Sequence, residues 1–125
     1  MPNSPLLLIV DDSRTSRLLI RAVITTLRPL WRILEASNGE EALQQVAQSP
    51  VQFISMDVNM PGASGLDVAG QIRLAHPDIR IVLCTANIQE SVRHSAAAAG
   101  LAFVPKPVTE RSVRESLVFW EETGT

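Results

Sequence analysis

Five short, predominantly apolar runs constrain the fold of this chain more than any other feature. Each run is bounded by polar or turn-forming residues; the runs cover residues 6–10, 31–36, 51–56, 79–84 and 101–104. Apolar runs of this length, without strict alternation, are typical of strands that are covered on both faces, as in parallel sheets. The sequence therefore predicts five buried parallel strands.

The segments between these runs carry the signals of helices. Residues 13–27 place five apolar side chains at helical spacing, namely Leu19, Ile20, Val23, Ile24 and Leu27. Arginines occupy much of the opposite surface of this helix: Arg14, Arg17, Arg21 and Arg28. Three later helices are predicted to begin at N-cap residues: Asn38, which forms a capping box with Glu41, then Ser64 and Thr109. An alanine-rich segment over 88–99 predicts one more helix.

Strands and helices thus alternate in the order (βα)₅. Because crossovers between parallel strands are right-handed, this order predicts an α/β fold with a doubly wound, five-stranded parallel sheet. The length of 125 residues suits one domain, which we expect to span 1–125 with an ordered core over about 5–122.

Composition excludes several classes of protein. A net charge of −2 provides no general attraction for nucleic acid or an anionic membrane. The first apolar run lacks a basic leader and is too short to span a membrane. Cys84 is the only cysteine and lies within an apolar run, which predicts a buried free thiol and fits a reducing cytoplasm.

Polar side chains gather where the predicted strands end. Asp11 and Asp12 follow the first strand, Asp57 the third and Thr85 the fourth, and Lys106 follows the fifth. In an open parallel sheet, ligands bind beyond the carboxyl ends of the strands. Three of the five aspartates in the chain therefore meet at the predicted binding edge. Any one of them alone would be read as a helix cap or a turn residue, but the three together favour a site.

A divalent cation is the natural occupant of this edge. Crowded carboxylates repel one another unless a hard ion such as Mg²⁺ neutralises them through oxygen ligands. Lys106 is the only lysine among 11 basic residues, so its place at this edge also favours a role. A compact ammonium suits point contact with a phosphate or a carboxylate.

These residues, in this order, resemble the response-regulator receiver family, to which chemotaxis receivers belong. The resemblance spans essentially the whole chain, and its motifs are Val10-Asp11-Asp12, residues 38–43, residues 57–62 with Gly65, Thr85-Ala86 and residues 103–107. It implies a flavodoxin-like receiver fold with strand order 2-1-3-4-5. It also implies a phosphoacceptor signalling protein rather than an enzyme, although one that assists its own phosphorylation and dephosphorylation.

The resemblance assigns roles to the residues at the strand ends. Asp57 would accept a phosphoryl group from a phosphohistidine, and Asp12, Asp57 and the Asn59 backbone carbonyl would bind Mg²⁺ directly. Asp11 would act through a metal-bound water. Lys106 and the Thr85 hydroxyl would hold the phosphoryl oxygens, which agrees with phosphoryl transfer being mainly positioning and charge neutralisation.

The resemblance further implies a switch and a set of partners. Thr85 would couple to Phe103 on the fifth strand and reshape the surface formed by the fourth helix, the fifth strand and the fifth helix for partner binding or dimerisation. The Lys106-Pro107 peptide bond would be cis. The donor would be a sensor histidine kinase or a histidine phosphotransfer protein, and the recipient a downstream protein or an output domain. The chain would be a stand-alone receiver or one excised from a larger regulator or hybrid kinase.

Other functions fit the sequence less well. A haloacid-dehalogenase-type phosphatase requires a second aspartate two positions after Asp57, where Asn59 stands. Binding of a flavin or nucleotide would call for a glycine-rich phosphate loop, and neither common form of that motif is present. The alternative that stays open is a receiver-like interaction module that acts without phosphorylation.

Overall fold

The computed structural model describes residues 4–86 and 101–122. Its strands form one sheet in the order β2-β1-β3-β4-β5, and every neighbouring pair is parallel. The strands are β1 Leu6–Val10, β2 Arg32–Ala36, β3 Phe53–Asp57, β4 Arg80–Thr85 and β5 Leu101–Pro105; the helices are α1 Arg14–Leu27, α2 Gly39–Gln48, α3 Gly65–Ala75 and α5 Glu110–Glu121. The predicted parallel sheet and its strand order are confirmed. The helix predicted over 88–99 lies outside the described residues.

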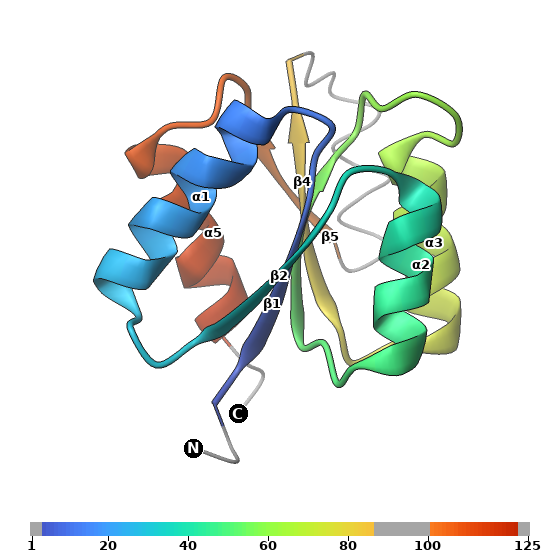
Figure 1. Ribbon diagram of the computed structural model, residues 1–125, viewed down its shortest axis with the longest axis horizontal. Helices are drawn as coiled ribbons and strands as arrows, with labels where there is room; N and C mark the ends of the chain where they lie inside the picture. The colour runs from blue at the N-terminus through green and yellow to red at the C-terminus, as the bar shows by residue number, and fades with distance from the viewer. Residues whose placement is uncertain (1–3, 87–100, 123–125) are drawn as a thin grey trace.

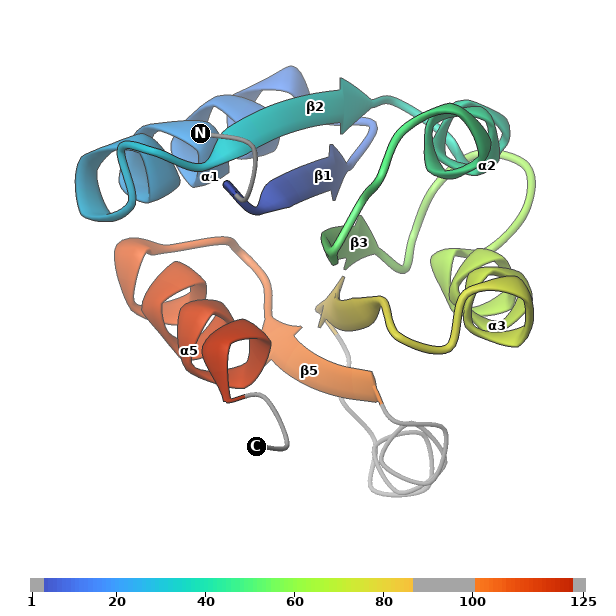
Figure 2. The ribbon, with the colours of Figure 1, turned by 90° about the horizontal axis from the view of Figure 1, so that it is seen from below.

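The helices cover the two faces of the sheet in pairs. Helices α1 and α5 lie on one face, and α2 and α3 lie on the other (Figure 1; Figure 2). Successive residues of a strand point to opposite faces, so β1 supplies both cores. Leu6, Leu8 and Val10 pack in the core beneath α2 and α3, whereas Leu7 and Ile9 pack beneath α1 and α5. This division explains why the strand is apolar throughout.

The predicted helix caps are confirmed, with one difference of detail. Asn38, Ser64 and Thr109 each accept a backbone N–H with the side chain. The capping box expected from Asn38 and Glu41 is incomplete, because the Glu41 carboxylate accepts from the N–H and hydroxyl of Ser37 instead of from Asn38. The complete capping box belongs to Thr109 and Ser112.

Two side chains of α1 differ from the sequence pattern. Leu19 was expected in the buried stripe but is 36% exposed, because Ile20 and Ile24 are the residues that point directly at the sheet. Arg17 was expected on the outer surface, yet its side chain is only 17% exposed. The helix is therefore rotated so that Arg17 approaches the carboxyl end of β1.

No helix in residues 4–86 or 101–122 is long and apolar enough to cross a membrane.

Candidate functional site

The register of β1 against β3 brings two aspartates side by side. Val10 is paired with Met56, so Asp11 and Asp57 follow at the same level of the sheet. Asp57 is the last residue of β3, and Asp11 directly follows β1 and donates its N–H to the Ala36 carbonyl at 3.1 Å. Both backbones are thus held by the sheet, and both residues are only 1% exposed.

Asp12 joins these two residues to form a cluster of carboxylates. One carboxylate oxygen from each of Asp11, Asp12 and Asp57 lies within 4.8 Å of the others. Ser13, rather than either aspartate, is the N-cap of α1, so the two carboxylates are not taken up in capping. No hydrogen-bond donor from the described part of the chain reaches Asp57 Oδ2. Asp11 Oδ2 is likewise buried and accepts no hydrogen bond from the described residues. Hard oxygen ligands of this kind fit a divalent cation.

Lys106 lies across the two buried aspartates. Its Nζ is 3.1 Å from Asp57 Oδ1 and 3.2 Å from Asp11 Oδ2, so the ammonium forms an ion pair with each carboxylate. The Lys106 backbone N–H donates to the Thr85 carbonyl at 2.9 Å, and the following bond to Pro107 is cis, as expected. Three carboxylates and one ammonium leave two negative charges, which a divalent cation would balance.

The environment makes Asp57 a weaker acid than an exposed aspartate. Burial raises its pKa, the Asp11 charge raises it further, and the Lys106 contact opposes both, so the pKa is about 6. For Lys106, burial lowers the pKa, but the hydrogen bond to Asp57 and the charge of Asp11 outweigh burial and raise it. Lys106 is therefore charged at neutral pH, and Asp57 is mostly ionised.

Asn59 and Thr85 complete the surroundings of Asp57. The Asn59 backbone N–H donates to Asp57 Oδ1 at 3.1 Å. The chain after β3 therefore turns back toward the Asp57 carboxylate. Thr85 ends β4 and is 5% exposed. Phe103 of β5 is paired with Leu83, two residues before Thr85, so Phe103 and Thr85 lie on the same face of the sheet. Phe103 is half-buried against the core beneath α2 and α3.

Gly65 allows the loop after β3 to fold against Asp57. Its N–H donates to the Val58 carbonyl at 3.0 Å, and a Cβ at this position would lie 2.0 Å from the Asp57 carbonyl oxygen. Only glycine permits so close an approach. The sequence motif contained Gly65, but the pattern alone indicated no contact with Asp57.

Arg17 also contacts the site, and the sequence pattern did not predict this. Its Nη1 donates to the Asp11 backbone carbonyl at 2.6 Å, and its Nε donates to Glu35 at 2.8 Å. The sequence held no specific signal for this contact, because Arg14 also opposes the helix dipole from the first position of α1 and is exposed.

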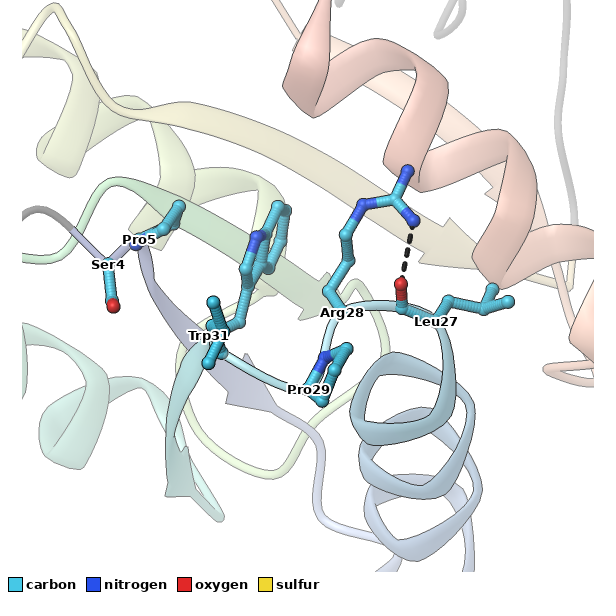
Figure 3. Close-up of a pocket in the computed structure, with 7 residues that line it drawn as sticks. Ser4, Pro5, Leu27, Arg28, Pro29 and Trp31 are labelled. Atoms are coloured by element: carbon cyan, nitrogen blue, oxygen red, sulfur yellow. Dashed lines mark hydrogen bonds between the residues drawn. The ribbon is translucent and has the colours of Figure 1, made fainter. Parts of the chain in front are cut away.

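A cavity of about 360 Å³ lies at the opposite end of the sheet and is not part of this site (Figure 3). It is lined by Ser4, Pro5 and residues 27–31. Arg28 is its only charged side chain, and that guanidinium is already bound to Glu121 and to the Leu27 carbonyl. The cavity therefore lacks the acidic groups that distinguish the carboxyl edge.

Comparison with known proteins agrees with this geometry. A family model for the response regulator receiver domain matches residues 7–118. The chemotaxis protein CheY of Thermotoga maritima is 31% identical over 112 residues, which cover 88% of this chain and 92% of that protein. The cyclic di-GMP phosphodiesterase response regulator RpfG of Xanthomonas campestris is 32% identical over 111 residues, 86% of this chain but only 29% of that longer protein.

A solved structure of a third relative extends the comparison to the fold. The response regulator TrrA of Thermotoga maritima, solved in complex with Mg²⁺–BeF, is 32% identical. It superposes with a TM-score of 0.79 over 93% of this chain and 98% of that one. The buried aspartate pair, the lysine that spans it, the sheet order and these matches lead to one conclusion: the chain belongs to the response regulator receiver family.

Proposed function

We propose that this chain is a receiver that accepts a phosphoryl group on Asp57, in a reaction that depends on Mg²⁺. The observation that carries the proposal is the environment of Asp57, which is buried and held by Lys106 and the Asn59 N–H through Oδ1, while Oδ2 has no donor among the described residues. Oδ1 is thus held in place, and Oδ2 is available to bind a cation or to bond to phosphorus. The complex of the relative TrrA with Mg²⁺–BeF supports the same assignment.

In the proposed reaction, the bond between phosphorus and the imidazole nitrogen of a phosphohistidine breaks. A bond forms between phosphorus and an Asp57 carboxylate oxygen, and the departing imidazole keeps the electron pair and can take up a proton. The product is an acyl phosphate. Mg²⁺, when bound, supplies positive charge to the phosphoryl oxygens.

The residues around Asp57 would then position and neutralise the incoming group. Asp12, Asp57 and the Asn59 carbonyl would hold the metal directly, and Asp11 would act through a metal-bound water. Lys106, already charged beside Asp57, would turn to a phosphoryl oxygen, and the Thr85 hydroxyl would donate to another. None of these steps requires a general acid or base on the protein. The chain is thus a phosphoacceptor rather than an enzyme with a separate substrate.

The proposed output is a change at the surface that includes β5 and α5. Thr85 and Phe103 share a face of the sheet, so a shift of the Thr85 hydroxyl toward the phosphoryl group would open space for Phe103. Receivers of this family work between histidine kinases and output partners. We therefore propose that this chain acts in the cytoplasm, with a sensor histidine kinase or a histidine phosphotransfer protein as donor. A protein or output domain would be the recipient, and direct binding to nucleic acid or membrane is not part of the proposal.

Intact mass spectrometry after incubation with acetyl phosphate and Mg²⁺ tests the acceptor. We expect one added mass of roughly 80 Da, the mass of a phosphoryl group, and its loss when EDTA replaces Mg²⁺. Asp57→Asn should remove the label, whereas Asp67→Asn, which changes an exposed aspartate of α3, should keep it. No label on the wild-type chain would favour an interaction module that acts without phosphorylation.

A further inference from the structure

Arg17 contacts an aspartate of the carboxylate cluster through the backbone. Its guanidinium binds two acceptors from different segments: Nη1 donates to the Asp11 carbonyl at 2.6 Å, and Nε donates to Glu35 Oε1 at 2.8 Å. Arg17 lies in α1, Glu35 in β2, and Asp11 follows β1. The side chain thus ties three segments together beside the site.

The Asp11 carbonyl is a sensitive place for such a contact. It belongs to the planar peptide group that joins Asp11 to Asp12, so its direction is coupled to the direction of both residues. The Asp11 N–H is held by the Ala36 carbonyl, and Asp11 Oδ1 accepts the Ser13 N–H at 2.8 Å. With the Arg17 contact added, the N–H, the carboxylate and the carbonyl of Asp11 each take part in a hydrogen bond.

Glu35 and Arg21 keep Arg17 in this position. Arg21 donates to Glu35 Oε2 at 2.7 Å, so the Glu35 carboxylate is shared between the two arginines. Burial raises the pKa of Glu35, but the hydrogen bonds from Arg21 and Arg17 outweigh burial and lower it, so the carboxylate stays charged. A helix directs its side chains toward its N-terminus, which aims Arg17 back at the Asp11 carbonyl.

The placement of Arg17 is electrostatically costly in other respects. The first turn of α1 contains no acidic residue, so the helix itself does not offset a cation near the positive end of its dipole, and the balancing charge comes from Glu35 of β2. A lysine could not serve in its place, because only the planar guanidinium presents several donors at fixed angles. The two contacts therefore require the forked arrangement of guanidinium donors, and positive charge alone is not enough.

We propose that Arg17 is a positioning residue for the metal site. Held by Glu35, it fixes the peptide plane between Asp11 and Asp12 and thereby the directions of both carboxylates. Mg²⁺ demands near-ideal octahedral geometry, so a small rotation of this plane weakens binding. The inference rests on the proposed function, because it assumes that these carboxylates bind Mg²⁺.

Arg17→Lys tests the proposal, because it keeps the positive charge and removes the fork. Titration with Mg²⁺, followed by NMR, should show a Kd about tenfold higher than that of the wild type, which is the lower end of the effect of changing a residue behind metal ligands. The rate of phosphorylation by acetyl phosphate should fall at low Mg²⁺ and recover at saturating Mg²⁺. Glu35→Gln, which loosens Arg17 without changing it, should raise the Kd by a smaller factor.

Arg28→Lys is the matched control on the same helix. Arg28, at the far end of α1, also binds a carboxylate, that of Glu121. It donates to the Leu27 backbone carbonyl as well (Figure 3). The variant should leave the Kd for Mg²⁺ unchanged, although both lysine variants lower Tm in metal-free buffer.

Each outcome decides between the possibilities. A Kd in Arg17→Lys within twofold of the wild type, or an equal rise in Arg28→Lys, would overturn the positioning role. Failure of the wild-type chain to bind Mg²⁺ would overturn the proposed function together with this inference. If Arg17→Lys does not fold, the Kd of Glu35→Gln decides, and a wild-type value would count against the proposal.

Discussion

Asp57 combines a weak acidity with a fixed position, and both follow from its place at the end of β3. The sheet buries its carboxylate and sets it beside Asp11, which raises the pKa to about 6. Lys106 opposes this effect but does not cancel it. Without a metal, the ionised form of Asp57 is therefore a local source of instability, which a bound cation would relieve.

The raised pKa links Asp57 to stability. The folded chain holds the Asp57 proton more tightly than the unfolded chain, whose pKa is about 3.9. The stabilising contribution of this group is therefore present below about pH 4 and is lost as pH rises through about 6.

Asp57→Asn should thus stabilise the metal-free protein at pH 8, by about 1–3 kcal/mol. Urea unfolding in EDTA measures the difference.

The same comparison at lower pH and with Mg²⁺ supplies the controls. At about pH 4 the gain should vanish, because wild-type Asp57 is then neutral as well. Saturating Mg²⁺ at pH 8 should also reduce the gain, since the cation stabilises the folded wild-type chain. A gain that is the same at pH 4 and pH 8 would contradict the raised pKa.

At the scale of elements, the connection from β3 to α3 is shaped by the contact between Gly65 and the Asp57 backbone. Gly65 opens α3, and Ser64 caps that helix by accepting the Leu66 N–H. A Cβ on Gly65 would overlap the Asp57 carbonyl oxygen. The helix and the strand end can therefore approach each other only with glycine at this position.

Gly65→Ala should consequently destabilise the protein by about 1–3 kcal/mol, the usual cost of overpacking a tight contact. It should also slow phosphorylation, because the clash would displace Asp57. The matched control is Gly70→Ala in the same helix, where a Cβ meets no atom within 4 Å. That variant should be more stable by about 0.5–1 kcal/mol, since alanine favours the helix. Equal Tm values for the two variants would contradict the close-contact explanation.

At the scale of the whole molecule, the carboxyl and amino ends of the strands carry different groups of side chains. The carboxylates lie at the carboxyl edge. At the other edge Trp31 stacks on Phe53 at 5.0 Å, and Trp120 lies 6.3 Å from Trp31 between ring centroids. Trp31 precedes β2, Phe53 begins β3, and Trp120 is near the end of α5. A five-residue strand, about 16 Å long, separates this aromatic cluster from the site.

The tryptophans should therefore report unfolding but not metal binding. Titration with Mg²⁺ should leave the intrinsic fluorescence unchanged, whereas an NMR titration under the same conditions should show binding. Urea should shift the emission to longer wavelength as Trp120, now fully buried, becomes exposed. A fluorescence change that saturates together with the NMR signal would show that the two edges are coupled.

Much of this architecture could be predicted from local pattern. The apolar runs marked the five strands to within two residues at each end, and Asn38, Ser64 and Thr109 marked the helix starts. Strand ends were harder, because the pattern stops at the last apolar residue whereas the ladder continues through Asp57 and Thr85. Those two residues are therefore held by the sheet rather than by loops.

The sequence alone determined which side chains meet at the carboxyl edge, since parallel strands bring their ends together whatever the details of packing. Only the tertiary structure decided how they meet. Three features depend on distances between different segments of the chain. They are the contact that Arg17, one of ten arginines, makes with Asp11, the approach of Gly65 to Asp57, and the pKa of Asp57. Local spacing governs the formation of strands and helices, whereas burial and charge–charge contacts arise only when those elements pack.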